Sequence, residues 1–597
     1  MPENILIAIA WPYANSEIHV GNITGSHLPG DIVARYHRLK GDNVLMVSGT
    51  DSHGTPVTIA ADREGRPVEE VYKKYHDGFL ELFQGYGITY DLFTTTHTEN
   101  HFKVSQSIFL ALQRNGYLYT QKSMQWYSPA AGKFLPDRYV EGTCYICGFE
   151  GARSDQCDNC GNVLEPEKLI NPRSKVDGSI PELRETEHFY MDLSKQEPDV
   201  VEFLRQRAGY MRDTVLGESL RKIEAEGLKP RPITRDLDWG IPVPVEGWDG
   251  KRIYVWFEAV IGYLSAAVEW AHVSGNSEAW KHWWTDPAAR SFYFIGKDNI
   301  FFHTAMWPAE LMGAGDQFLR IFAEEEGTLT LPYDVPANQF MNLEGRKISG
   351  SRNWAVWGRD ALTRYDPDAL RYYLTINMPE NHDSDWDWAE FVAKNNNELV
   401  ATWGNLANRV LSFCYKNWDG HVPSIDVSTL RPADLELLQA IEKGFRTVGD
   451  ELEAVHLRSA LQEAMRLAAE VNKYLDTSAP WFAIKTDKDA AAKSIYTALK
   501  AIDSLKILLA PFLPFSCQKL HEIFGYEQPL FGEQYTEAET DSLGEHTVLR
   551  YRLGREAVPL LWKPSELKAG AKLNPPAPLY KKLDESVVEE ERARLGK

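Results

Sequence analysis

The sequence lacks the long apolar run that a membrane-spanning helix needs. No stretch of its 597 residues approaches the roughly 18 to 20 apolar residues required to cross a bilayer. No secretory signal precedes the first apolar segment, and there is no internal repeat or low-complexity block. These absences exclude an integral membrane protein and predict a chain of cytoplasmic type with no membrane partner.

Positive charge is also scarce relative to negative charge. The chain has 64 Lys and Arg against 85 Asp and Glu, for a formal net charge of −21. This balance excludes a broadly basic nucleic-acid coat, although a local basic stripe can still dock a polyanion. Taking about 100 to 200 residues per domain, the length predicts roughly three to five domains and favours a multidomain enzyme.

Cysteine is rare, and most of it is gathered in one place. Two CxxC pairs, with nine residues between them, can bring four thiolates to tetrahedral distance around one ion. Soft sulfur ligands favour zinc. The alternative is two disulfides in a secreted protein, which the missing signal peptide disfavours. We therefore predict one structural Zn²⁺ per chain at Cys144, Cys147, Cys157 and Cys160, and ordinary core thiols at Cys414 and Cys517.

The apolar patterning indicates a parallel sheet. Short β-branched runs at 4–10 and 43–49 flank a helical stretch at 28–39, and similar runs recur at 252–257 and 291–298. Strands that alternate with helices form a doubly wound, Rossmann-type α/β sheet, with ligands at the strand C-termini. The sequence therefore predicts a nucleotide-type site where the first strands end.

The pattern also divides the chain into regions. Amphipathic stretches at 396–413, 433–453 and 490–509 predict a helical bundle. A Pro-rich tail is expected to extend as an arm before a short acidic helix. The expected regions are a first catalytic half (1–115), an insertion with the cysteine pairs (116–230), a second catalytic half (231–325), a basic-loop region (326–390), a helical domain (391–560) and the tail (561–597).

Two short segments carry nucleotide chemistry. His19-Val20-Gly21-Asn22 follows the first strand and enters a helix, so helix N–H groups can face phosphates. Lys347-Ile348-Ser349-Gly350-Ser351 is a basic loop of small residues that can stabilise a leaving pyrophosphate. Taken alone, His19 could simply be a histidine that starts a helix, and the loop could be an ordinary solvated loop.

Together these segments resemble the class I aminoacyl-tRNA synthetases, in which HVGN takes the place of the HIGH motif and KISGS that of KMSKS. Within the class, the chain is similar to the methionyl-tRNA synthetases from Ile5 to about Leu561. Besides the cysteine pairs, the patches that carry this resemblance are Ala10 to Asn15, Asp51 to Pro56, Tyr254 to Tyr263, Phe294 to Asp298 with Phe302 and His303, Asn405 to Arg409, and Ala479 to Trp481.

The resemblance implies a two-step reaction: methionine and ATP form methionyl adenylate, and tRNA(Met) then accepts the methionyl group. It assigns the methionine pocket to Trp11, Tyr13, Asp51, Trp256, Ala259, Val260, Tyr263, Phe302 and His303, with Asp51 taking the ammonium. The implied catalytic residues are His19, Asn22, Lys347, Ser349 and Ser351. ATP, carried with Mg²⁺, is expected at Gly21, Arg235, Lys297, Asp298, Gly350 and Arg352, and the anticodon at Asn405, Arg409, Pro480 and Trp481.

Two departures from the family pattern stand out. Asn22 replaces the second histidine of HIGH but keeps an amide donor, whereas Gly350 replaces the second lysine of KMSKS, leaving Lys347 and Arg352 as the nearest cations. Only about 35 residues follow Trp562, which is too few for an OB-type dimerisation domain and predicts a monomer.

Two other functions stay open on sequence alone. One is another class I synthetase, for an aliphatic amino acid or cysteine. The Ile, Val and Leu enzymes carry an editing insertion of roughly 200 residues because a pocket discriminates one methylene by only about 1 to 3 kcal/mol. The insertion of about 115 residues here leaves no room for one. The other is a non-catalytic, synthetase-derived tRNA-binding protein, which Gly350 would favour.

Overall fold

A twisted sheet forms the centre of the molecule. The computed structural model describes residues 2–135, 139–154, 157, 159–160, 164–175, 178–553 and 561–597. Within them the sheet has seven strands, and its first five pair in parallel as the sequence predicts. Their order is β14 (Ala337–Asn338), β13 (Arg290–Gly296), β1 (Asn4–Ile9), β2 (Asn43–Thr50), β3 (Leu92–Thr95), β19 (Gly544–Arg552) and β18 (Glu533–Asp541).

Helices cover both faces of this sheet. Ile5 and Ile7 of β1 enter one hydrophobic core, and Leu6 between them enters the other, because successive side chains of a strand point to opposite faces. Both faces are buried, which explains the nearly continuous apolar run of β1. The first core includes α2 (Leu28–Lys40) and α4 (Val68–Tyr86); the second includes α5 (Glu99–Arg114), α8 (Val255–Val273) and α10 (Trp307–Ala314).

One predicted strand is wrong over most of its length. The apolar run at 252–257 forms only a two-residue strand, β12 (Arg252–Ile253), which pairs with β11 (Thr234–Arg235) away from the central sheet. Tyr254 then caps α8, which begins at Val255. Helix α8 is apolar on nearly all sides because it is buried within the second core, and periodicity cannot separate such a helix from a buried strand. Trp256 therefore lies on the first turn of a helix.

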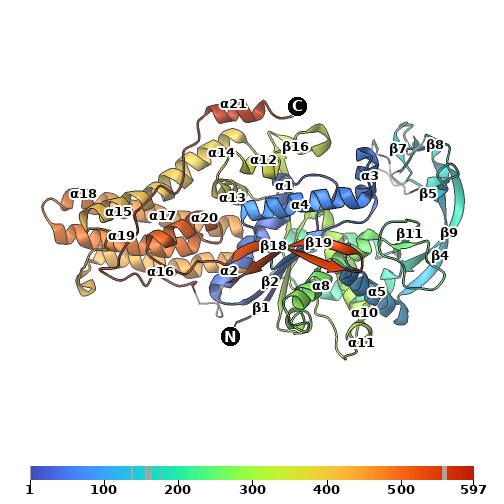
Figure 1. The fold of residues 1–597 in the computed structure, drawn as a ribbon, viewed down its shortest axis with the longest axis horizontal. Coiled ribbons are helices and arrows are strands. Elements are labelled where there is room, and N and C mark those ends of the chain that lie inside the picture. Colours follow the sequence, from blue (N-terminus) through green and yellow to red (C-terminus); the bar gives the residue numbers. More distant parts are fainter. Residues whose placement is uncertain are drawn as a thin grey trace.

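The predicted insertion is a separate, largely antiparallel region. Strand β4 (Leu118–Ser128) pairs along its length with β9 (Glu182–Met191), and the cysteine pairs lie beside a smaller sheet. That sheet lies at the far end of the long axis from the helical bundle (Figure 1). The remaining elements here are β5 (Lys133–Phe134), β6 (Val140–Thr143), β7 (Ala152–Arg153), β8 (Ile170–Ser174), α6 (Glu197–Arg205), α7 (Asp213–Glu226) and β10 (Arg231–Pro232).

The helical bundle is confirmed, with bounds close to those predicted. A π-helical segment (Asn395–Gly404) runs into α15, and α16, α17 and α19 pack on one another. In the described part of the chain, no helix is long and apolar enough to cross a bilayer. The bundle helices are α15 (Asn405–Asn417), α16 (Pro432–Glu453), α17 (Leu457–Ser478), α18 (Pro480–Ala483), α19 (Lys488–Leu509) and α20 (Pro514–Ile523).

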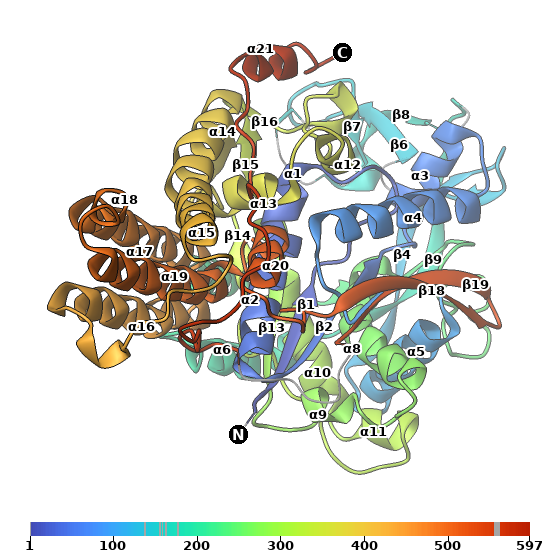
Figure 2. The same ribbon diagram turned by 60° about the vertical axis from the view of Figure 1, so that its left-hand side comes forward.

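The chain does not stay helical to residue 560 as the sequence analysis expects. After α20 it returns to the catalytic region as the hairpin of β18 and β19, which lies against the central sheet in both ribbon views (Figure 2). Leu549 pairs antiparallel with Phe93, so the hairpin covers the edge of β3. Buried Val548 and Leu549 anchor it. The last part of the expected helical region, 554–560, lies outside the described residues.

Short elements connect the sheet to the bundle. The tail runs past the bundle to α21 (Ser586–Arg592), the acidic helix that the sequence predicts, which packs on α14 and is drawn above it in Figure 2. The connecting elements are α12 (Gly358–Leu362), α13 (Pro367–Ile376) and α14 (Trp388–Lys394), with β15 (Met341–Leu343), β16 (Arg346–Lys347) and β17 (Ser384–Trp386).

Candidate active site

A cavity of about 450 Å³ opens at the C-terminal ends of β1, β2 and β13. This is where a doubly wound sheet binds its ligands. All nine residues that the resemblance assigns to methionine line it, together with His19, Gly21, Asn22, Asp298 and Lys347. The structure therefore gathers side chains from segments more than 300 residues apart in the sequence into one site.

The wall of the cavity is aromatic. Trp256 and Phe302 stack with ring centroids 4.3 Å apart, and Tyr13 meets Trp256 edge-on at 6.3 Å. Trp11 lies between two glycines: a Cβ atom at Gly49 would come within 2.1 Å of its ring. At the other glycine, Gly262 of α8, the distance would be 2.7 Å. These glycines permit the close approach that sets the Trp11 ring in the wall.

Two buried side chains of the cavity, Tyr263 and His303, satisfy each other by a hydrogen bond. His303 Nδ1 lies 2.9 Å from the Asn299 carbonyl oxygen, and burial lowers the pKa of His303 to about 4. The ring is therefore neutral at pH 7, with its proton on Nδ1. Tyr263 then donates its hydroxyl proton to His303 Nε2, at 2.7 Å.

Asp51 lies at the base of the cavity and is only 2% exposed. Its backbone pairs with the segment after β1: Asp51 N donates to the Pro12 oxygen and Ala14 N donates to the Asp51 oxygen. Burial, together with the nearby Glu258 charge, holds the pKa of Asp51 well above its usual range. A cationic ligand would stabilise the ionised form, so Asp51 is suited to accept an ammonium group.

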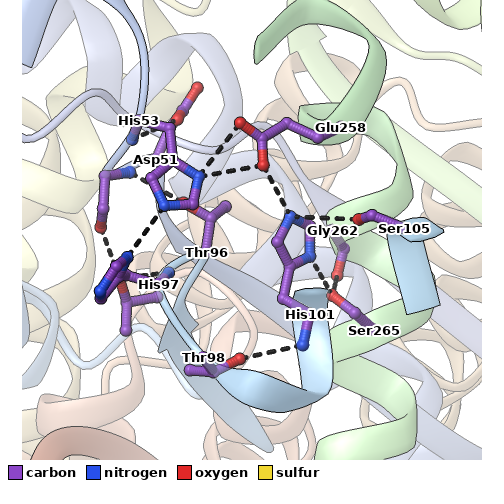
Figure 3. Close-up of polar contacts among 12 residues, drawn as sticks. Asp51, His53, Thr96, His97, Thr98, His101, Ser105, Glu258, Gly262 and Ser265 are labelled. Atoms are coloured by element: carbon purple, nitrogen blue, oxygen red, sulfur yellow. Dashed lines mark hydrogen bonds and ion pairs between the residues drawn. The ribbon is translucent and has the colours of Figure 1, made fainter. Parts of the chain in front are cut away.

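A buried polar network lies behind Asp51, as Figure 3 shows. Glu258 Oε2 is 3.0 Å from His53 Nδ1 and 3.3 Å from His101 Nε2, and His101 Nδ1 is 2.7 Å from Ser265 Oγ. Burial lowers the pKa of His53 to about 3 and raises that of Glu258. Sequence reasoning gave these residues no role, although Glu258 and His53 lie inside patches that carry the resemblance.

The HVGN segment starts a helix and orients its own donors. His19 Nδ1 accepts from the Asn22 backbone N–H, and Asn22 Oδ1 accepts from the His19 backbone N–H, which forms a capping box. Burial lowers the pKa of His19 to about 4. Because Nδ1 accepts, the proton of the neutral ring is on Nε2, and the amide NH₂ of Asn22 is the part left to donate.

The two nucleotide signatures are in direct contact. Val20 N donates to the Val356 oxygen at 3.0 Å, and His19 forms a backbone bridge with Trp357 just beyond the KISGS loop. A Cβ atom on Gly21 would lie 3.1 Å from the Ile348 side chain. Lys347 and Ile348 line the cavity from this side. The sequence predicted both motifs, and the structure brings them together.

Six residues predicted for catalysis or ATP do not line this cavity. Lys297 pairs with Asp383 at 2.7 Å, and Arg235 lies 3.9 Å over the Tyr254 ring, facing two neighbouring cavities. The others belong to the outer part of the loop, where Arg352 Nε donates to Ser349 Oγ at 3.2 Å. The six are Arg235, Lys297, Ser349, Gly350, Ser351 and Arg352, and their roles stay predictions.

Phe340 is a cavity residue that sequence reasoning missed. Lys297 Nζ lies 4.1 Å from its ring centroid and Lys347 Nζ lies 5.2 Å away, so two cations lie near one aromatic ring. No spacing signal precedes Phe340, because a loop after β14 brings it to the cavity. Its position beside Lys347 suits contact with a flat base or a phosphate.

The four clustered cysteines are close enough to hold one metal ion. Their Sγ atoms lie within 4.8 Å of one another, and within the described ranges this is the one group of His, Cys, Asp or Glu residues with such a geometry. No disulfide joins any of the six cysteines, all of which are described. Asn159 Nδ2 also donates to Cys147 Sγ at 3.7 Å. Cys414 and Cys517 are buried, as predicted.

The residues predicted to read the anticodon meet on the bundle. The Arg409 guanidinium carbon lies 4.7 Å from the Trp481 ring centroid, and Trp481 packs edge-on against Phe413. Asn405 lies one turn before Arg409 on α15, and Pro480 begins α18 beside Trp481. Phe482, which sequence reasoning missed, is 70% exposed next to them. The cluster combines a cation, an amide and aromatic faces.

The parallel sheet, with HVGN after its first strand and the KISGS loop packed against HVGN, defines a class I aminoacyl-tRNA synthetase. The family model "tRNA synthetases class I (M)" matches residues 5–411, and "Anticodon binding domain of methionyl tRNA ligase" matches residues 423–547. The chain belongs to the methionyl-tRNA synthetase family.

Full-length relatives agree with this assignment. The methionine–tRNA ligase of Thermomicrobium roseum is 52% identical over 595 residues, covering 100% of this chain and 99% of that protein. That of Roseiflexus sp. (strain RS-1) is 51% identical over 605 residues, with 100% and 99% covered. The structure of Mycobacterium tuberculosis methionyl-tRNA synthetase in complex with methionyl-adenylate has a TM-score of 0.74 at 23% identity, covering 97% of this chain and 99% of that one, and shares the fold.

Proposed function

We propose that the chain is an ATP-dependent methionine–tRNA ligase that forms methionyl adenylate and passes the methionyl group to tRNA(Met). The observation that carries this is the single cavity in which an aromatic wall and a buried carboxylate meet both nucleotide signatures. A thioether is flexible and polarizable and gains from contacts with aromatic rings, so this wall suits methionine better than a branched side chain.

The methionine subsite follows from the burial of its polar groups. The ionised Asp51 carboxylate accepts the ammonium, and Trp256, Phe302 and Tyr13 surround the thioether side chain. Neutral His303 and Tyr263 satisfy each other, so neither leaves an unpaired charge in the pocket. The substrate carboxylate then faces the HVGN side of the cavity, where it can attack the α-phosphate of ATP.

ATP is proposed to bind across the two signatures. His19 Nε2–H and the Asn22 amide donate to phosphate oxygens from the helix N-terminus, and Lys347 supplies positive charge to the leaving pyrophosphate. Asp298, Gly21 and the loop residues Ser349, Ser351 and Arg352 complete the proposed nucleotide contacts. Mg²⁺, bound with ATP, neutralises phosphate charge. The protein performs no covalent chemistry and acts by positioning and charge.

The 3′ end of tRNA has a suitable approach beside this cavity. A second cavity of about 310 Å³ shares Trp256, Phe302 and Asp298 with the first. Lys222 Nζ lies 4.9 Å from the Phe301 ring in it, and Arg231 and Arg235 add two more cations. Cations interleaved with aromatic rings bind single-stranded nucleotides by charge and stacking. The transferred methionyl group would leave the first cavity on this side.

The anticodon is proposed to bind the cluster on the bundle. Unpaired bases stack on aromatic rings and are read at their edges by amide and guanidinium groups. Arg409 and Asn405 supply these groups, and Trp481, following Pro480, supplies the ring. Phe482, which is 70% exposed, offers a second ring on which an unpaired base could stack.

Zinc is the proposed metal at the four cysteines. A closed set of four thiolates fits Zn²⁺ in a structural role, with no position left for a substrate. The proposed substrates are those of protein synthesis, and the cavity residues named above need no second subunit, so we propose an enzyme that works as a monomer in the cytoplasm.

Pyrophosphate exchange tests the proposed function. Methionine should drive exchange of labelled pyrophosphate into ATP, and leucine, isoleucine, valine and cysteine should not. Exchange driven by one of those amino acids would identify another class I synthetase. An absence of exchange with every amino acid, together with binding of tRNA(Met), would identify the non-catalytic alternative that Gly350 raises.

A further inference from the structure

We propose that Trp357 is a positioning residue for adenylate formation: its indole packs against Gly350 and ties the KISGS loop to the HVGN helix. Glycine at position 350 is then the partner of Trp357 and not simply a lost lysine. This inference rests on the proposed adenylation activity, and it assigns a role to a tryptophan outside both signatures.

The first observation concerns the space beside Gly350. A Cβ atom built on Gly350 would lie 3.1 Å from Trp357 Cη2, closer than side chains normally approach. Gly350 is not among the glycines with positive φ, so its backbone does not require glycine. The stem of a lysine at 350 would therefore press on the edge of the indole ring. Packing, and not conformation, makes glycine the residue that fits there.

The indole also closes the loop through a hydrogen bond. Trp357 Nε1 donates to Asn353 Oδ1 at 2.8 Å. Asn353 is left-handed, with φ of 48°, and its backbone N–H donates to the Gly350 oxygen at 3.0 Å. Asparagine tolerates this conformation better than most residues. Trp357 therefore holds both ends of the turn from Gly350 to Asn353.

The other side of Trp357 reaches the HVGN helix. Its backbone bridges to His19, the two ring centroids are 6.3 Å apart, and the flanking Gly358 N–H donates to the Ile18 oxygen at 2.9 Å. Trp357 is thus in contact with the donor that faces the phosphates and with the loop that carries Lys347. A displacement of its ring would change the distance between these groups.

Trp354 provides a matched comparison within the same loop. Its Nε1 donates to the Leu343 oxygen at 3.0 Å, and Arg346 lies 4.8 Å over its ring. The atoms nearest to a Cβ atom at Gly350 belong to Trp357 and none belongs to Trp354. If any tryptophan of the loop served equally, the two would be interchangeable. The contact with Gly350 makes Trp357 the one that matters for the loop.

The experiment is a double-mutant cycle on the full-length enzyme. Methionine-dependent pyrophosphate exchange is measured for wild type, Gly350→Lys, Trp357→Ala and the double variant, with Trp357→Phe and Trp354→Ala beside them. We expect Trp357→Ala to lower kcat about tenfold or more while the KM for methionine stays within about twofold, as for groups that act mainly in the transition state. Trp357→Phe, which keeps a ring, should recover part of the rate, and Trp354→Ala should be milder.

The decisive quantity is the coupling between the two positions. Gly350→Lys should slow exchange in wild type because the lysine stem meets the indole, and should be harmless or helpful once Trp357 is alanine. A coupling of about fivefold or more is expected for residues in contact. Single effects that simply multiply, or equal losses from Trp357→Ala and Trp354→Ala, would overturn the proposal.

A second measurement separates this inference from the proposed function. Trypsin cleaves after Arg346, Lys347 and Arg352, so the cleavage rate of the native enzyme reports how firmly the loop is held. Trp357→Ala should raise the rate of cleavage at these sites several-fold, and Trp357→Phe should raise it less. This result does not depend on which amino acid the enzyme activates. If wild type showed no exchange, the proposed function would fail while this result could still stand. Unchanged cleavage in Trp357→Ala would refute the tie between the loop and the helix.

Discussion

The methionine side and the phosphate side of the cavity are built in opposite ways. On the methionine side, Asp51, Tyr263 and His303 are buried, and each is held by backbone or side-chain hydrogen bonds. On the phosphate side, Lys347 is exposed and belongs to a short loop of small residues. The methionine side, called the socket below, is a preformed pocket made of these buried residues and the aromatic wall. The phosphate side is a charged loop whose position depends on the residues packed against it.

This difference separates specificity from rate. Contacts present before the reaction select the substrate, whereas charge directed at a leaving group acts in the transition state. Substitutions in the socket should therefore change the KM for methionine, and substitutions in the loop should change kcat.

Asp51→Asn should have the largest effect. It leaves the ammonium of methionine in a buried site without a counter-charge, and breaking such a pair costs about 3 to 5 kcal/mol. We expect the KM for methionine to rise by a corresponding factor while the KM for ATP changes little. Steady-state exchange over a range of methionine concentrations measures this. An equal rise in the KM for methionine and the KM for ATP would mean that Asp51 does not act on methionine alone.

Lys347→Ala should show the reverse pattern. Loss of one donor that faces a developing charge costs about 2.7 to 4 kcal/mol of transition-state stabilisation. Single-turnover formation of methionyl adenylate should slow accordingly, with the methionine affinity nearly unchanged. Arg352→Ala should be milder, because its Nε is bonded to Ser349 at the outer part of the loop. If both variants stay within about twofold of wild type, the positive charge comes from elsewhere.

Trp481→Ala should leave both sides of the cavity intact. The anticodon cluster lies on the bundle, so pyrophosphate exchange should persist while the kcat/KM for tRNA aminoacylation falls. Loss of one stacked base costs about 1 to 3 kcal/mol. Both pyrophosphate exchange and tRNA aminoacylation are measured on the same preparation of the variant. Parallel losses in both assays would mean that Trp481 stabilises the bundle and does not contact tRNA.

The pH dependence of methionine binding should be the mildest effect. The pKa of Asp51 is raised in the folded free enzyme, whereas the ammonium requires the carboxylate, so the KM for methionine should rise as pH falls through that raised pKa. The limit is about tenfold per pH unit. The contribution of Asp51 to the free energy of unfolding is fully present below its unfolded pKa and is lost as pH rises through its folded pKa. A flat profile of the methionine KM between pH 5 and 8 would place the folded pKa outside that range.

The sequence predicted the socket better than the loop. Every residue that the resemblance assigns to methionine lines the cavity, because these residues follow β1, β2 and β13 or lie on the first half of α8, which faces the same strand ends. Arg235 and Lys297 are long, charged side chains, and their directions depend on partners such as Tyr254 and Asp383 that no sequence spacing reveals. Trp357 was missed for the same reason, since its partner Gly350 is recognised only in three dimensions.

One predicted strand was wrong, and neither the antiparallel strands of the insertion nor the hairpin of β18 and β19 was predicted. Parallel strands are recognised as short apolar runs and bundle helices by their amphipathic periodicity, but the apolar start of the buried helix α8 reads like a strand. The hairpin was not predicted because much of β18 is polar and exposed, as in Glu533 and Glu537, so its pattern carries little burial signal. These residues form strands because β18 and β19 pair along their length and Leu549 of β19 also pairs with Phe93.

That pairing sets the order in which the protein can be completed during synthesis. Strand β3 leaves the ribosome near residue 95, but its edge stays unpaired until residue 549 follows, more than 450 residues later. For most of translation, the nascent catalytic region therefore presents an open strand edge, the feature that most readily recruits other chains. A ribosome that stalls within the bundle would release a chain with both signatures but an open sheet edge, which favours aggregation.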